Sequence, residues 1–141
     1  MPDLSMRGMH RLADWWIDDP DNPGRASLSS PAVQHLAVEL VPGCRLADLG
    51  GTMSLNARLD PADLVLRVHQ PFVSRQRLLA VQAARSTLAH GGLNAPVPIV
   101  RGGSTLFRCG DRWAELEPYI PHARPEPTLA SYQWLFGEIG V

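Results

Sequence analysis

Residues 64–71, with the sequence LVLRVHQP, form the stretch that decides the fold we expect for this chain. Its side chains alternate in type, so they would point to opposite faces of a β-strand. One face takes Leu64, Leu66 and Val68, and the other takes Val65, Arg67 and His69. Pro71 ends the strand, because proline cannot donate to a strand ladder. A charged residue in mid-strand is costly to bury unless it is paired, so Arg67 either faces solvent or has a partner.

Two further strands are expected just before this one. Residues 45–49 form a short strand, and residues 54–59 alternate between polar and apolar side chains. The sequence GGTM at 50–53 supplies the turn between them. A second turn, DPAD at 60–63, leads into the strand at residue 64. This order predicts a meander of antiparallel strands.

Two helices flank these strands along the chain. A helix over residues 31–40 begins with Ser30 at its N-cap and ends at a Pro-Gly pair. A longer helix over residues 75–90 is capped by Ser74 and ends at a Gly-Gly pair. Helical spacing predicts one buried stripe on this longer helix. The stripe consists of Leu78, Val81, Ala84 and Leu88.

The remaining strands follow the longer helix. Two prolines keep residues 93–98 extended. We then expect strands at about 99–101 with 105–108, and at 112–117, separated by glycine turns. The predicted fold class is therefore α+β, a five-stranded antiparallel sheet with one long packed helix. An N-terminal helix and the start of a C-terminal helix complete the prediction.

The chain divides into three parts. Residues 1–27 are expected to be a flexible N-terminal extension, with a short helix around residues 9–17 and a turn-forming run after it. Residues 28–120 form the domain itself. Residues 121–141 begin with a stiff proline-rich linker, and a new helical pattern starts at Thr128.

Composition excludes several classes of function. The 141 residues carry 13 Lys+Arg and 14 Asp+Glu, so the net charge of −1 does not favour nucleic-acid binding. Every basic residue is an arginine, which excludes Schiff-base and P-loop lysine chemistry. No run approaches the roughly 20 apolar residues that span a bilayer. Cys44 and Cys109 are interpreted as buried thiols, and the histidines lack metal-ligand spacing. We expect a cytoplasmic protein that binds neither nucleic acid nor membrane.

Three features of the sequence can carry chemistry. The N–H groups of Gly50 and Gly51 can approach phosphate oxygens, although such a pair also makes ordinary hairpin turns. Arg67 lies on the expected strand that begins at residue 64, and its side chain could reach back toward the glycine turn and bind a nucleotide's phosphates. The strand 113–117 runs into a proline-rich segment, 118–122. Backbone groups at that strand end could read the edge of a base, or the segment could be a plain connector.

The order of these motifs resembles that of a known family. The motifs are Gly50-Gly51-x-x-Ser54-x-Asn56, LVLRVHQP at 64–71, GL-x-APVPI at 92–99 and AELEPYIP at 114–121. Over about residues 30–141 they are similar to the N-terminal lobe of the aminoglycoside phosphotransferase and choline kinase-like family, which has a protein-kinase-like fold. The resemblance implies that ATP, with Mg²⁺, binds between two lobes and that a small molecule accepts the phosphate. The identity of that acceptor stays open.

The resemblance also assigns the nucleotide-binding residues by position. Those over the phosphates would be Gly50, Gly51, Ser54 and Asn56, with Arg67 as the strand cation. Those beside adenine would be Pro118, Tyr119 and Ile120.

The sequence departs from the family in two respects. The family's long helix carries a glutamate that pairs with the strand cation, but residues 75–90 contain no acidic residue. Gln82 or a neighbour would have to be the partner of Arg67. The catalytic His-x-Asp motif of the family is also absent, so no catalytic residue is assigned.

Three readings follow. The chain is a nucleotide-binding N-lobe without its catalytic C-lobe, and therefore inactive alone. Alternatively it is a non-catalytic module that binds a nucleotide, or a partner, and could self-associate through the surface that would face a C-lobe. The third reading is an unrelated structural α+β domain.

Overall fold

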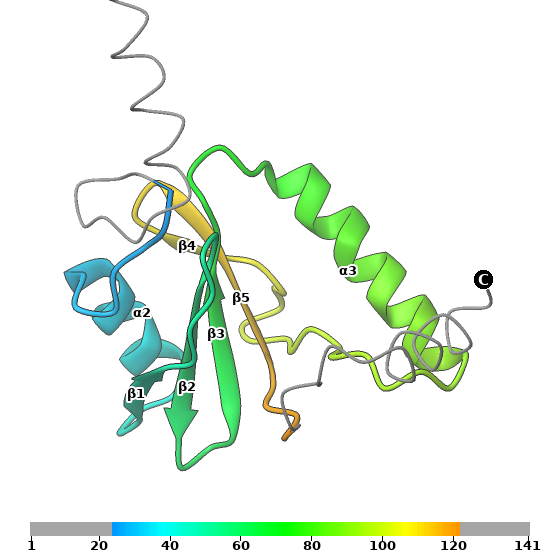
Figure 1. Cartoon of the computed structure of the whole chain (residues 1–141), viewed down its shortest axis with the longest axis horizontal. Helices are drawn as coiled ribbons and strands as arrows, with labels where there is room; N and C mark the ends of the chain where they lie inside the picture. The colour runs from blue at the N-terminus through cyan, green and yellow to red at the C-terminus, as the bar shows by residue number, and fades with distance from the viewer. Residues whose placement is uncertain (1–23, 122–141) are drawn as a thin grey trace, which may run out of the picture.

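Five antiparallel strands form one sheet in the spatial order β1-β2-β3-β5-β4 (Figure 1). The structure is a computed structural model and describes residues 24–121. Its elements are α2 (Pro31–Leu40), β1 (Arg45–Asp48), β2 (Leu55–Asp60), β3 (Leu64–Val68), α3 (Arg75–His90), β4 (Phe107–Cys109) and β5 (Arg112–Pro118). The predicted α+β class and the five-stranded antiparallel sheet are confirmed.

The two faces of the sheet differ in chemistry. On β2, Leu55, Ala57 and Leu59 are fully buried, and the residues between them are only partly buried. The pairing of β3 with β5 extends this division, because it places Leu66 opposite Leu116 and Arg67 opposite Glu115. Side chains alternate between faces along each strand. One face is therefore aliphatic, and the other carries charged groups.

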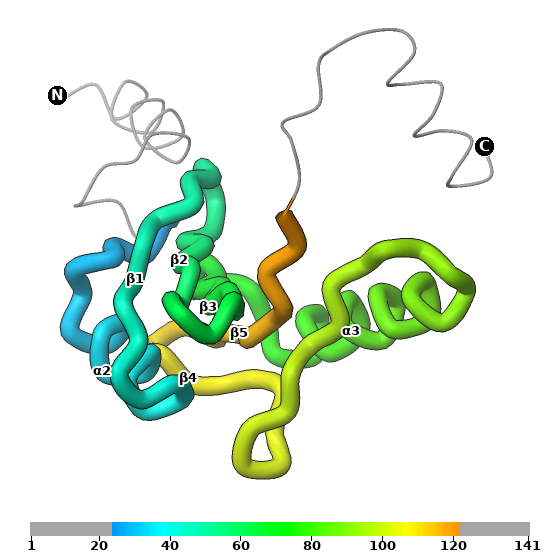
Figure 2. Tube along the Cα trace, turned by 90° about the horizontal axis from the view of Figure 1, so that it is seen from below, coloured from blue at the N-terminus to red at the C-terminus, as the bar shows by residue number. Residues whose placement is uncertain are grey.

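The aliphatic face is covered by α2. Its inward residues Val33, Leu36 and Ala37 are buried in one cluster with the leucines of β2, β3 and β5. Fully burying an aliphatic side chain contributes about 1.5–3 kcal/mol, so this contact is the main hydrophobic contribution to the fold. Figures 1 and 2 show α2 on one side of the sheet and α3 on the other.

The long helix α3 has the predicted bounds but not the predicted buried stripe. Ser74 caps it as expected, since its Oγ accepts the N–H of Arg77 at 3.2 Å. Leu78 is buried, whereas Val81 and Leu88 are 44% and 48% exposed, and Ala84 is exposed as well. The other buried residue of the helix is the polar Gln82. The prediction of an apolar stripe was wrong because α3 approaches the charged face of the sheet.

The segment between α3 and β4 also differs from the prediction. In place of strands at 99–101 and 105–108, the structure has a single bridge between Arg101 and Ser104, and β4 begins at Phe107. The N–H of Ile99 donates to the carbonyl of Leu116 at 2.8 Å. This one hydrogen bond ties the extended segment to the outer edge of β5.

Other expectations fall partly outside the described residues. The predicted helix at 9–17 and the helical pattern from Thr128 lie outside residues 24–121. Within that range, no helix is long and apolar enough to cross a bilayer. Cys44 and Cys109 are free thiols, and burial raises the pKa of each above its ordinary value. Cys109 is buried, as the sequence indicated, whereas Cys44 is only partly buried.

Candidate functional site

A pocket of about 530 Å³ is lined by the glycine turn after β1 and by the end of β5. Its lining mixes aliphatic and charged groups. The residues are Leu49, Gly50, Asn56, Val65, Arg67, Asn94, Pro96, Glu117, Pro118, Tyr119 and Ile120. Six of the eight residues assigned to the nucleotide are among them, namely Gly50, Asn56, Arg67, Pro118, Tyr119 and Ile120. Gly51 and Ser54 belong to the adjoining turn and do not line the pocket.

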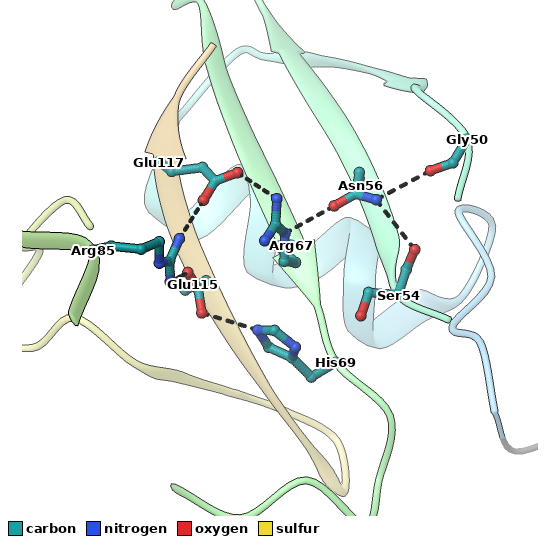
Figure 3. Close-up of polar contacts among 8 residues, drawn as sticks. All are labelled: Gly50, Ser54, Asn56, Arg67, His69, Arg85, Glu115 and Glu117. Carbon is teal, nitrogen blue, oxygen red and sulfur yellow. Dashed lines mark hydrogen bonds and ion pairs between the residues drawn. The ribbon is translucent and has the colours of Figure 1, made fainter. Parts of the chain in front are cut away.

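The Arg67 guanidinium is held from two sides on the charged face of the sheet (Figure 3). Its Nε donates to Oδ1 of Asn56 at 2.9 Å, and its Nη2 donates to Oε1 of Glu117 at 2.8 Å. The side chain remains 34% exposed. Within residues 24–121, its Nη1 has no partner. Arg67 is thus both paired and able to offer an N–H to an anion in the pocket.

A chain of ion pairs continues from Arg67 across β5 to α3 (Figure 3). The second carboxylate oxygen of Glu117 accepts from Nη1 of Arg85 at 2.8 Å. The other terminal nitrogen of Arg85 pairs with Glu115. Glu115 in turn lies 2.9 Å from Nε2 of His69. Both carboxylates are almost fully buried, so each depends on these cationic partners.

The two buried carboxyl groups differ in pKa. Burial raises the pKa of Glu115, but its hydrogen bonds with His69 and Arg85 outweigh burial and leave the pKa below its ordinary value. Burial also raises the pKa of Glu117, and there the attraction of Arg67 and Arg85 only partly offsets it. Glu115 is therefore the carboxylate that the fold holds most firmly in its charged form.

The glycine turn is held by its own polar contacts. Gly50 and Gly51 have φ values of +90° and +112°, which L side chains rarely adopt. The N–H of Gly50 donates to Oδ1 of Asp48 at 2.8 Å. Arg25 donates to the same oxygen at 2.7 Å and to the carbonyl of Gly51 at 2.8 Å. The amide of Gly50 that could approach a phosphate is thus bonded to a carboxylate here.

The end of β5 presents its backbone in two ways. The N–H of Tyr119 donates to the carbonyl of Asp63 at 2.9 Å, so this amide is used within the sheet. Pro118 lies opposite Leu64 in the same ladder. Because antiparallel pairs alternate between bonded and non-bonded, the Pro118 carbonyl points away from β3. The Tyr119 ring lies 4.2 Å from the guanidinium carbon of Arg58.

Gln82 is not the partner of Arg67. Its amide exchanges hydrogen bonds with Thr105, with Thr105 Oγ1 donating to Gln82 Oε1 at 2.7 Å. The carboxylate on Arg67 comes from β5, and α3 contributes a cation, Arg85, in place of an acid. Sequence reasoning missed Glu117, although the acids at 115 and 117 share one strand face with Arg67 once β3 and β5 are paired. The signal in the sequence was the spacing of Glu115 and Glu117, because two acids at alternate positions of a strand lie on the same face and can pair with a cation there.

Comparison with family models, with curated protein sequences and with solved structures gave no match. Within residues 24–121, no group of three or more His, Cys, Asp or Glu side chains could hold a metal ion. The pocket does offer a guanidinium, aliphatic walls and an exposed strand-end backbone to an organic anion.

Proposed function

We propose that the pocket binds an adenine nucleotide, and that this domain is the nucleotide-binding lobe of an ATP-dependent small-molecule phosphotransferase. The observation that supports the proposal best is the meeting of Arg67 and the backbone of residues 117–120 in one pocket. Arg67 and Glu117 are 50 residues apart along the chain, yet their side chains are hydrogen-bonded to each other. The pocket's volume also falls in the range of about 300–1,000 Å³ that is usual for small-molecule sites.

Each end of the pocket would serve a different part of the nucleotide. Arg67 would bind phosphate oxygens, since a guanidinium already fixed by Asn56 and Glu117 loses little freedom on binding. Toward the end of β5, the base would lie against aliphatic groups such as Val65, which is paired with Glu117. The carbonyl of Pro118 would accept a hydrogen bond from an exocyclic amine. Binding of this kind is mostly positioning, which is also the main requirement of phosphoryl transfer.

The transfer step itself would need groups from elsewhere. When bound, ATP supplies the phosphoryl group. The sequence contains no His followed two residues later by Asp, so no residue of this chain is assigned to catalysis. We therefore expect the 141-residue chain to bind nucleotide without transferring phosphate. A non-catalytic nucleotide-binding module would behave in the same way.

Titration calorimetry with the purified chain tests the proposal. We expect ATP to bind to the wild-type chain. The substitution Arg67→Gln should lower the affinity for ATP by about tenfold or more, because a charge-assisted hydrogen bond is lost. Arg45→Gln is the matched control, since Arg45 is exposed on the edge strand β1 and does not line the pocket. If the folded chain binds neither ATP nor adenosine, the proposal is wrong. Phosphate transfer to any acceptor by the pure chain would overturn the expected inactivity.

A further inference from the structure

The long helix α3 approaches the sheet through polar side chains. Near its middle, Gln82 is buried and bonded to Thr105 on the segment before β4. One turn further on, Arg85 reaches across to β5. The aliphatic Val81 and Leu88 are about half exposed. Arg85 therefore provides the link between the second half of α3 and the charged face of the sheet.

Arg85 and Arg67 share a single carboxylate. Oε1 of Glu117 accepts from Arg67, and Oε2 accepts from Arg85, both at 2.8 Å. The Glu117 side chain is only 5% exposed, so water cannot easily replace either cation. Glu115 holds the other end of the Arg85 guanidinium. A guanidinium can bridge two carboxylates in this way because its N–H groups form a rigid planar fork.

From this arrangement we propose that Arg85 is a positioning residue for Arg67. It fixes the carboxylate of Glu117, and Glu117 fixes the guanidinium that faces the pocket. The phosphate affinity of the pocket then depends on where α3 lies, although Arg85 does not line the pocket. The choice of a phosphate as the ligand rests on the proposed function. The link between Arg85 and Arg67 does not, because it is made of contacts within the protein.

The substitution Arg85→Lys tests this link most directly. Lysine keeps the positive charge beside Glu115 but lacks the planar fork, so it cannot bridge both carboxylates in the same geometry. Arg77→Lys is the matched control, because Arg77 is exposed on the same helix. In the ligand-free protein, NMR would measure how fast the Nη2 hydrogens of Arg67, which bond to Glu117, exchange with solvent. We expect faster exchange in Arg85→Lys and wild-type exchange in Arg77→Lys.

Calorimetry adds a functional readout. Arg85→Lys should lower the affinity for ATP by about tenfold, as expected for the loss of one charge-assisted contact. The affinity for adenosine should stay unchanged. A merely structural role would weaken both ligands alike. If the wild type binds neither ligand, the proposed function fails, and the exchange of the Arg67 Nη2 hydrogens still decides the positioning role. Wild-type exchange in Arg85→Lys overturns the positioning role, as does an equal loss of both ligands.

A second variant covers the case in which Arg85→Lys does not fold. Glu117→Gln keeps the size of the side chain but replaces one of the two accepting oxygens by a donating NH2 group, so the bond to Arg67 or the bond to Arg85 is lost in the same geometry. We expect the same faster exchange at Arg67 and the same selective loss of ATP. Arg67 Nη2 hydrogens that stay protected in Glu117→Gln would show that the carboxylate of Glu117 does not hold the guanidinium, and the proposal would be wrong.

Discussion

Substituting the two glycines of the turn one at a time separates backbone strain from the placement of Asn56. A Cβ at Gly51 would lie 2.9 Å from Nδ2 of Asn56, too close for real contacts, and 3.2 Å from the carbonyl of Ser54. A Cβ at Gly50 would meet nothing within 4 Å. Both positions have strongly positive φ. Gly50→Ala therefore introduces strain alone, and Gly51→Ala introduces strain and also displaces Asn56.

The size of the effect follows from these contacts. A residue in a sparsely populated region of φ costs about 1–3 kcal/mol, which both variants share. The Asn56 amide donates to the carbonyls of Gly50 and Ser54 at 3.1 and 3.3 Å. Each such bond contributes about 0.5–1.5 kcal/mol net, and less where it is exposed. We expect Gly51→Ala to destabilise the protein by about 1–2 kcal/mol more than Gly50→Ala.

Urea denaturation of a double-mutant cycle measures this difference. In an Asn56→Ala background the amide is gone, so Gly51→Ala should cost only the strain and the tight contact with the Ser54 carbonyl. The coupling free energy between the two sites should then be about 1–2 kcal/mol, and that between Gly50 and Asn56 close to zero. Equal costs for the two glycine variants, with additive behaviour in both cycles, would refute the argument that Gly51 is needed for the approach of Asn56.

Two further predictions concern stability. Leu116 is fully buried, so Leu116→Ala should lower the free energy of unfolding by about 2–5 kcal/mol, whereas Leu88→Ala on the exposed side of α3 should change it by less than about 0.5 kcal/mol. Similar urea midpoints for the two variants would contradict the assignment of the core. The pKa of Glu115 is lowered by folding from its ordinary 4.5, so its contribution to stability is present above pH 4.5 and is lost as the pH falls below it. Glu115→Gln should therefore flatten the acid limb of a stability-against-pH curve, and an unchanged slope would show that other carboxylates cause the acid loss.

Local signals in the sequence were enough for the helices and for the central strands. Ser74 caps the start of α3, and Ser30-Pro31 marks the start of α2, although the Ser30 side chain makes no capping hydrogen bond there. The pairs Pro42-Gly43 and Gly91-Gly92 follow the ends of the two helices. Alternating side chains placed β2, β3 and β5 to within one residue. The alternation of side chains could not place the strand before β5. Ahead of β4, residues 99–106 form only one isolated bridge, between Arg101 and Ser104.

The candidate site was predicted less completely, because its contacts are made between distant elements. The sequence singled out Arg67 as a mid-strand cation, and that position does line the pocket. Its partner Glu117 depends on the register of β3 against β5, which no local pattern determines. The helix face was misjudged for the same reason. An apolar stripe on α3 was the natural expectation until Glu115 and Glu117 were known to face it.

The alternating sequence of β5 also protects the sheet from mispairing. A slip of one residue would turn Glu115 and Glu117 into the aliphatic core and bring Leu116 to the position beside the arginines. Both faces would then be penalised together, since buried carboxylates would lose their cations and the cations their carboxylates. An all-aliphatic strand would tolerate such a slip, and would also pair readily with a strand from another molecule. The charged residues of β5 that contribute to the pocket therefore also disfavour the wrong strand register, and pairing with strands of other molecules, while the chain folds.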